Sequence, residues 1–172
     1  WQVVAIGCTT AAGVYNGRCI RFSDVEDRTS WTPSTTNLAY EYILPSVGRI
    51  VGARFVGAYL FVWTEADLYI GSYVGDPSQV WRFDLAGQNC GLAGPLAVTN
   101  DQQSAFWINR VGKMMTASVG AAPVTIDSPV LRDAWSHVAT AQAEKIVVST
   151  VGQFGEVWVH YPDNRDGTEN SR

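Results

Sequence analysis

The residues that most often carry acid–base and metal chemistry are sparse in this chain. His137 and His160 are the only histidines, and they do not form the HExxH spacing that places two imidazoles on one metal. No GxSxG segment is present to position a nucleophilic serine beside either histidine. We therefore predict that both histidines have surface or structural roles.

The acidic residues lie mainly at predicted turns. Glu65 and Asp67 form the one candidate carboxylate pair, but their spacing within a turn fixes no distance between them. Carboxylates at turns usually accept hydrogen bonds from backbone N–H groups, which we also expect of Asp76 and Asp101. A sialidase-like site would need clustered arginines to bind a carboxylate, whereas the arginines appear scattered: Arg49, Arg54, Arg82, Arg110 and Arg132.

Three cysteines are present, namely Cys8, Cys19 and Cys90. Their odd number and the absence of CxxC spacing argue against both a disulfide framework and a zinc site. Cys8 and Cys19 lie in neighbouring predicted strands and can touch, but we interpret all three as small buried apolar residues. Gly48–Gly52 lacks the pattern of a phosphate-binding loop. The sequence thus predicts no catalytic residue, no cofactor and no metal ligand.

Composition limits the classes of partner. The net charge is −4 and lysines and arginines form no run, so the sequence lacks the basic surface of a nucleic-acid-binding protein. It also lacks a long apolar segment or a leader-like N-terminus, so we predict no membrane association. Charged residues make up only 16% of the chain, and the chain contains seven tryptophans. This favours surfaces covered by other subunits, with a ligand site as the alternative.

A repeat indicates the architecture that would position these residues. Predicted first strands begin at positions 3, 50, 97 and 144, a constant step of 47 residues. That period lies within the range of β-propeller blades. We predict an all-β fold over residues 1–172 as a single domain. It would be a β-propeller-like array of about four blades, complete or incomplete, with one short helix inserted.

Local patterns refine this prediction. Tyr59–Trp63 is apolar at every position, which is typical of a strand covered on both faces. Trp63, Trp107 and Trp158 lie near the ends of corresponding strands, and we expect each to pack between blades. Asn16-Gly17 predicts a type I′ hairpin turn, and Pro129–Ala143 has the spacing of an amphipathic helix capped by Ser128.

Two segments are expected to lie outside the repeat. Asp24–Tyr42 is rich in polar and turn-forming residues and is interpreted as a long surface excursion. Overlapping its start, the segment from Ser23 to Trp31 is similar to the Asp-box of sialidase propellers, a structural motif that braces a turn. The polar tail Asp163–Arg172 and the start at Trp1 lead us to expect a piece of a longer chain.

Several segments in order resemble structural proteins of tailed bacteriophages, the tail hub, nozzle or packaged-DNA-stabilisation proteins of podovirus-like particles. The similarity lies in these segments: 21–24, 31–33, 60–70, 73–75, 89–95, 106–108 and 156–162. The resemblance implies a non-enzymatic subunit of the virion tail, assembled in the host cytoplasm. It would form a ring of identical copies below the portal or connector, bind tail fibre or plug proteins, and contact DNA only as DNA passes through a channel.

A second hypothesis is a carbohydrate-binding propeller of a tail-associated receptor-binding protein. Trp31 and Trp81 lie outside the predicted middle strands, where an exposed indole would stack on a sugar. A sialidase-like hydrolase is the third hypothesis, and a fluorogenic substrate would test it.

Overall fold

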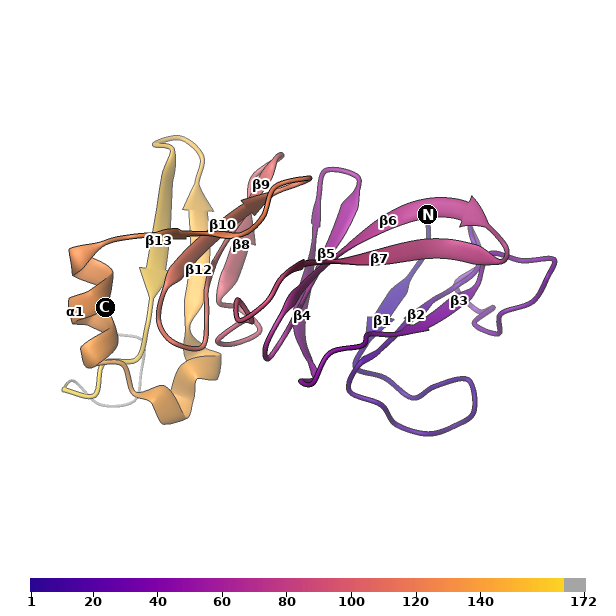
Figure 1. Cartoon of the computed structure of the whole chain (residues 1–172), viewed down its shortest axis with the longest axis horizontal. Coiled ribbons are helices and arrows are strands. Elements are labelled where there is room, and N and C mark those ends of the chain that lie inside the picture. Colours follow the sequence, from indigo (N-terminus) through magenta and orange to yellow (C-terminus); the bar gives the residue numbers. More distant parts are fainter. Residues whose placement is uncertain (166–172) are drawn as a thin grey trace.

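The computed structural model describes residues 1–165 and shows a mostly β protein, with 47% strand and 8% helix, built from four small antiparallel sheets. The sheets follow one another along the long axis of the molecule in chain order (Figure 1). The first contains β1 (Val4–Ile6), β2 (Cys19–Phe22) and β3 (Tyr40–Ile43). The second contains β4 (Ile50–Val56), β5 (Tyr59–Thr64), β6 (Leu68–Asp76) and β7 (Gln79–Gly87).

The third sheet contains β8 (Val98–Asn100), β9 (Ser104–Ile108), β10 (Met114–Ser118) and β11 (Val124–Ile126). The fourth contains β12 (Val147–Val151) and β13 (Glu156–His160). Within each sheet, strands that are consecutive in the chain are neighbours. Each sheet is therefore a meander, built from one continuous stretch of sequence.

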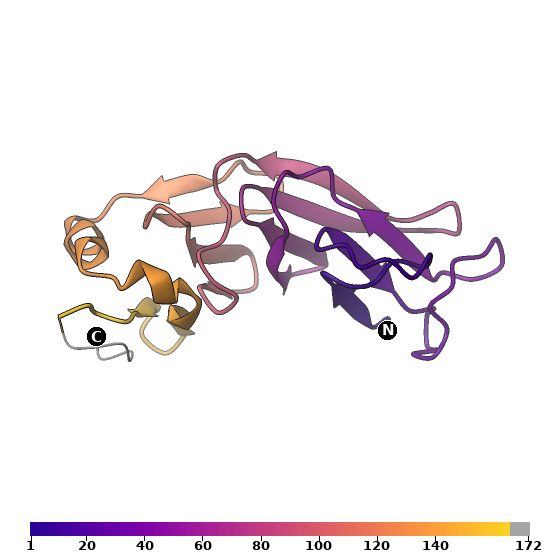
Figure 2. The same ribbon diagram turned by 90° about the horizontal axis from the view of Figure 1, so that it is seen from below.

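The predicted repeat is confirmed at the level of the sheets. Their first strands begin at Val4, Ile50, Val98 and Val147, close to the expected step. These first strands also contact one another in succession, β1 with β4, β4 with β8, and β8 with β12. Figure 2 shows the sheets as one row, with the first and last sheets at opposite ends. Residues 1–165 thus form an open row and no closed ring.

The middle strand of the second sheet is buried on both faces, as predicted. Leu60 and Val62 on one face pack with Phe22 of the first sheet. Phe61 and Trp63 on the other face pack with Trp107 of the third sheet. Because successive side chains of a strand point to opposite faces, a continuous apolar run lets β5 join two cores.

The tryptophan prediction is right for two residues and wrong for the third. Trp63 and Trp107 are fully buried, with ring centroids 5.4 Å apart in an edge-on arrangement. Trp158 is 49% exposed. Val157 and Val159 pack on the core shared with the third sheet, so the alternation along β13 directs Trp158 to the opposite face.

Asn16-Gly17 does not form the predicted type I′ turn, because neither residue has a positive φ. Asn16 instead accepts two hydrogen bonds in a local turn, from Cys19 N to its carbonyl oxygen and from Arg18 N to its Oδ1. The glycine is needed for a different reason, since a Cβ at position 17 would lie 2.9 Å from the Cβ of Arg49.

The predicted helix is present but shorter than expected. Helix α1 spans Pro129–Ser136, with Ser128 as its N-cap and proline in its first turn. It ends early because Ser136 Oγ and His137 Nδ1 both contact the carbonyl oxygen of Asp133, and a 3₁₀ helix follows at Thr140–Lys145. The helix does not replace an outer strand, since β11 precedes it as the fourth strand of its sheet.

The prediction that the segment 24–42 is a surface excursion is partly wrong. Its last residues belong to β3, and the surface excursion ends before Tyr40. At the C-terminal end, Asp163 is fully buried and bonded by Arg165 rather than part of an exposed polar tail. Residues 166–172 of the predicted tail lie outside the described part of the chain.

Candidate functional site

A pocket of about 540 Å³ lies where connections of all four sheets meet. The first sheet contributes Ile6 and Gly7, and the second contributes the segment around Arg49 and Glu65. The crossing to the third sheet contributes Ala93–Pro95, and the third and fourth units contribute Arg110, Thr140, Ala143 and Glu144. We call this the four-sheet pocket. It is the one hollow among those described that draws residues from every unit of the repeat.

Two arginines from different sheets converge on one carboxylate in this pocket. Glu65 Oε1 accepts from Arg49 Nε at 3.2 Å and from Arg110 Nη1 at 3.4 Å. Glu65 Oε2 accepts from the backbone N–H of Arg49 at 3.3 Å. Both guanidinium groups are more than half exposed, whereas the Glu65 side chain is one-third exposed. One carboxylate thus lies between two cations that keep most of their N–H donors in solvent.

The backbone holds Glu65 firmly at this position. It lies in the turn between β5 and β6, where Thr64 Oγ1 accepts hydrogen bonds from Ala66 N and Asp67 N. Two glycines pack directly against it. A Cβ at Gly48 would lie 2.7 Å from the Cβ of Glu65, and one at Gly91 would lie 2.3 Å from its carbonyl oxygen.

Glu65 and Asp67 do not act as the candidate carboxylate pair. Asp67 Oδ2 accepts from Ser46 Oγ at 2.9 Å, and Ser46 Oγ lies 2.9 Å from Thr64 Oγ1 within the protein interior. Glu65 instead interacts with the arginines. The two carboxylates therefore serve separate networks, with Asp67 bracing the turn.

The sequence missed the meeting of Arg49 with Arg110, because the arginines look scattered when they are read along the chain. The repeat held the missing signal. Glu65 follows the second strand of its sheet, and Arg110 follows the second strand of the next sheet. Equivalent turns of stacked units lie on the same side, so the two charges become neighbours.

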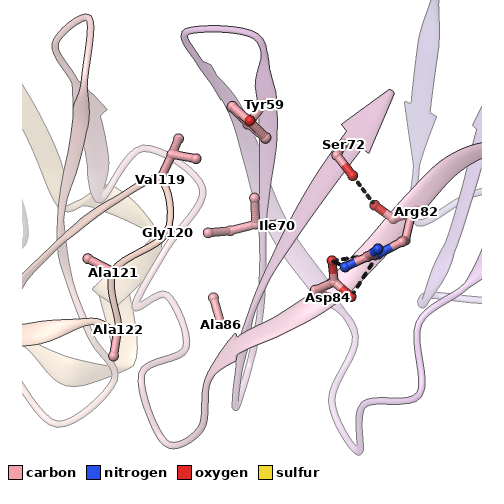
Figure 3. Close-up of a pocket in the computed structure, with 10 residues that line it drawn as sticks. All are labelled: Tyr59, Ile70, Ser72, Arg82, Asp84, Ala86, Val119, Gly120, Ala121 and Ala122. Atoms are coloured by element: carbon pink, nitrogen blue, oxygen red, sulfur yellow. Dashed lines mark hydrogen bonds and ion pairs between the residues drawn. The ribbon is translucent and has the colours of Figure 1, made fainter. Parts of the chain in front are cut away.

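A second hollow lies on the outer side, between the second and third sheets. Figure 3 shows the loop Val119–Ala122 facing Ile70 and Ala86 across this groove of about 470 Å³. Tyr59 lies at one end, and the ion pair between Arg82 and Asp84 lies on β7. We call it the outer groove. Small side chains on both walls leave the space open.

The histidines take structural or surface positions in the described chain. His137 caps the end of α1 through its Nδ1, which lies 3.0 Å from both Ser136 Oγ and the carbonyl oxygen of Asp133. His160 is exposed on β13, with its ring 6.3 Å from that of Trp158. His137 thus lies at a helix end and His160 on an exposed strand face, and their surface or structural roles stay a prediction.

The cysteines are free thiols. Burial raises the pKa of Cys19 to about 12, with the neighbouring Cys8 adding to the shift, and burial raises the pKa of Cys90 to about 11. A thiol with so high a pKa is a poor nucleophile at neutral pH. The interpretation of these two residues as buried apolar groups is confirmed, while Cys8 is only partly buried and bonds the carbonyl oxygen of Cys19.

The turn acids behave as predicted. Asp76 Oδ1 accepts from the backbone and hydroxyl of Ser78, and these bonds lower the pKa of Asp76. Asp101 Oδ1 accepts from two backbone N–H groups. In the Asp-box-like segment, Asp27 Oδ1 accepts hydrogen bonds from the hydroxyl and the backbone N–H of Thr29, and these bonds lower the pKa of Asp27. In the same segment, Trp31 Nε1 donates to the carbonyl oxygen of Arg28.

The two tryptophans named for sugar stacking differ in accessibility. Trp81 is 6% exposed, stacks on Phe22 with centroids 4.8 Å apart, and donates its Nε1 to Gln2 Oε1. It is thus a core residue of the first two sheets, which corrects the expectation of an exposed indole. Trp31 is partly exposed on its loop.

Comparison with models of known protein families finds no match for the chain. No curated protein matches it either. Within residues 1–165, no group of three or more His, Cys, Asp or Glu side chains is placed to hold a metal ion. In the same range, no helix has the length and apolar character to cross a membrane. The functional inferences therefore rest on the residues and their arrangement.

Proposed function

We propose that the four sheets are blades of a β-propeller-like array and that the chain is a structural subunit of a phage tail. In this proposal it forms part of a hub or nozzle ring below the portal or connector, continues the DNA channel, and attaches other tail parts. The succession of first strands supports the blade assignment, because the innermost strands of neighbouring blades adjoin. The resemblance of the ordered segments supports the tail assignment.

The observation that carries the proposal is an open face at the end of the row. In the fourth sheet, Val147 pairs with His160, Ser149 with Trp158, and Val151 with Glu156. Paired residues of antiparallel strands share a face, so these six side chains form one surface, which we call the end face. Its central residue, Trp158, is half exposed. In the second sheet, Trp63 near the end of β5 is covered by Trp107 of the sheet that follows.

A half-exposed indole that shares a strand face with Val147 and Val151 is typical of an assembly surface, where aromatic residues are enriched. The proposed partners are copies of the same chain in a ring, the portal or connector, and tail fibre or plug proteins. DNA would be contacted only as it passes through the channel. The proposal assigns the chain to the virion tail and gives it no enzymatic activity and no cofactor.

Light scattering on the purified chain at micromolar concentration tests the proposal. We expect the wild-type chain to self-associate, and we expect Trp158→Arg to shift it towards the monomer because a charge at an apolar contact is costly. Val130→Arg is the matched control, since Val130 is 76% exposed on α1, and α1 packs through Leu131 and Trp135 on the side of β13 that carries Val159, opposite to the end face. A wild-type chain that stays monomeric, or a Val130→Arg variant with the same effect as Trp158→Arg, would contradict the proposal.

Carbohydrate binding is the second candidate because the outer groove combines an accessible phenol ring with an ion pair. Tyr59 is 37% exposed, and Arg82 and Asp84 offer a planar donor and acceptor within the same hollow. Aromatic faces and planar polar groups suit sugar rings. A glycan array that shows binding by wild type and loss with Tyr59→Ala would favour this candidate, and silence of the array would remove it.

A further inference from the structure

The four-sheet pocket brings two arginine side chains onto one carboxylate oxygen. The carboxylate of Glu65 receives one guanidinium N–H from Arg49 and one from Arg110, both at its Oε1 atom. Two guanidinium groups that share one oxygen lie close enough to repel each other. In the described residues, these are the only interactions that the two guanidinium groups make, apart from solvent.

We infer that the four-sheet pocket binds an anionic group, a phosphate or a carboxylate, between Arg49 and Arg110. Each guanidinium keeps donors that can bond two oxygens of such a group side by side. A second anion would relieve the repulsion between the cations. This inference does not depend on the proposed tail function.

The existing contacts with Glu65 are weak enough to allow this exchange. The three distances to its oxygens lie between 3.2 and 3.4 Å, longer than those typical of strong charge-assisted hydrogen bonds. Ion pairs with this much exposure contribute little to stability, so the arginines are free to re-pair. The carboxylate itself stays in place, because Gly48 and Gly91 pack against its residue. Glu65 therefore keeps its position and holds the side chains of Arg49 and Arg110 near each other.

Glu144 is the other carboxylate that lines this pocket. It belongs to the 3₁₀ helix before β12, on the side of the fourth sheet, and its negative charge opposes the entry of an anion. The two acids and two arginines balance one another. We therefore expect the pocket to accept a single anionic group at the end of a ligand rather than a polyanion.

Titration with inorganic phosphate and, separately, with acetate tests the inference, with the ionic strength held constant by sodium chloride. Binding is followed by NMR through the side-chain Nε–H signals of Arg49 and Arg110. We expect a saturable shift with at least one anion, and its identity distinguishes a phosphate-bearing from a carboxylate-bearing ligand. A response to neither anion, or one equal to that of chloride, would overturn the inference.

Variants place the binding within the pocket. Arg110→Gln should weaken the binding about tenfold through the loss of one charge-assisted contact. Glu65→Gln and Glu144→Gln should each strengthen it, because each removes a competing negative charge. Arg82→Gln is the matched control, as Arg82 pairs with Asp84 in the outer groove. Equal affinity in wild type, Arg110→Gln and Glu65→Gln would overturn the assignment, and the circular dichroism of each variant checks its fold.

Discussion

Trp107 and Trp158 lie in the second strands of their sheets, yet their surroundings are opposite. Trp107 is fully buried against Trp63, and its Nε1 donates to the carbonyl oxygen of Cys90 at 2.8 Å. Trp158 is half exposed, and its Nε1 donates to Glu156 Oε2, also at 2.8 Å. Both indoles are satisfied as hydrogen-bond donors, so the difference lies in what covers the rings.

The comparison shows that the repeat places both tryptophans in second strands, while the face to which each indole points determines whether a neighbouring sheet covers it. Trp107 faces the second sheet, which fills the space on that side with Phe61 and Trp63. Trp158 points away from the third sheet and is 49% exposed. Burial of an indole stabilises the folded chain because the ring is removed from water, whereas an exposed indole can stabilise a complex when a partner covers it.

The largest expected effect comes from removing each indole in turn. Trp107→Ala should lower the free energy of unfolding by about 3–5 kcal/mol, because it leaves a cavity and orphans the Cys90 carbonyl group. Trp158→Ala should lower it by less than about 1 kcal/mol in the monomer. Urea denaturation followed by circular dichroism measures both values.

Should Trp107→Ala fail to fold, Trp107→Phe keeps most of the ring and gives a smaller loss that remains measurable. Similar losses for Trp107→Phe and Trp158→Phe would remove the distinction between the two positions.

Glycines sharpen the same comparison at the backbone. At Gly91, beside the interface of the second and third sheets, a Cβ would meet the carbonyl oxygen of Glu65. Gly91→Ala should therefore destabilise the protein by about 3 kcal/mol, since backbone must shift to admit the methyl group. Gly152 lies in the turn of the fourth sheet, with nothing within 4 Å of its Cβ position. Gly152→Ala should stabilise by about 0.5 kcal/mol. Thermal unfolding of both variants measures the contrast, and equal effects would contradict it.

The buried thiol at the interface of the second and third sheets predicts a dependence on alkaline pH. Burial raises the pKa of Cys90 from 9.0 to about 11, so the unfolded chain loses this proton at lower pH than the folded one. Its contribution to stability is complete below pH 9 and declines as the pH rises towards 11. We expect the urea midpoint to fall over that window, and we expect a shallower fall in Cys90→Ala. Parallel pH profiles for the two proteins would refute the assignment to Cys90.

The smallest effect is expected at the end face. Glu156→Gln keeps an acceptor for Trp158 Nε1 and removes an exposed charge. The free energy of unfolding should change by less than about 0.5 kcal/mol, as is usual for exposed positions. A loss as large as that of Gly91→Ala would mean that the end face is more tightly organised than its exposure indicates.

The sequence predicts the sheets better than the site. The step of 47 residues locates four sheets because each is a local meander, so its strands are set by contiguous residues. Apolar runs such as Tyr59–Trp63 also reveal burial directly. The exposure of Trp158 could not be read in this way, because the sequence does not show which face of β13 packs on the third sheet.

The candidate site illustrates a different limit. Arg49, Glu65 and Arg110 are far apart in the sequence, and only the stacking of the units brings them together. Asn16-Gly17 shows that a strong local signal also fails when its strands do not continue to the turn. There the glycine is required by the close approach of Arg49, which no local pattern reports.

The two-stranded build of the fourth sheet has a consequence for how the molecule comes apart. Within residues 1–165, the ladder of strand β13 runs along one edge, to β12, whereas β5 and β6 are each bonded on both sides. A strand bonded along one edge has fewer backbone hydrogen bonds to break in a local opening. Amide protons of this hairpin should therefore exchange with solvent before those of the second sheet, and we expect local unfolding to begin in the fourth sheet.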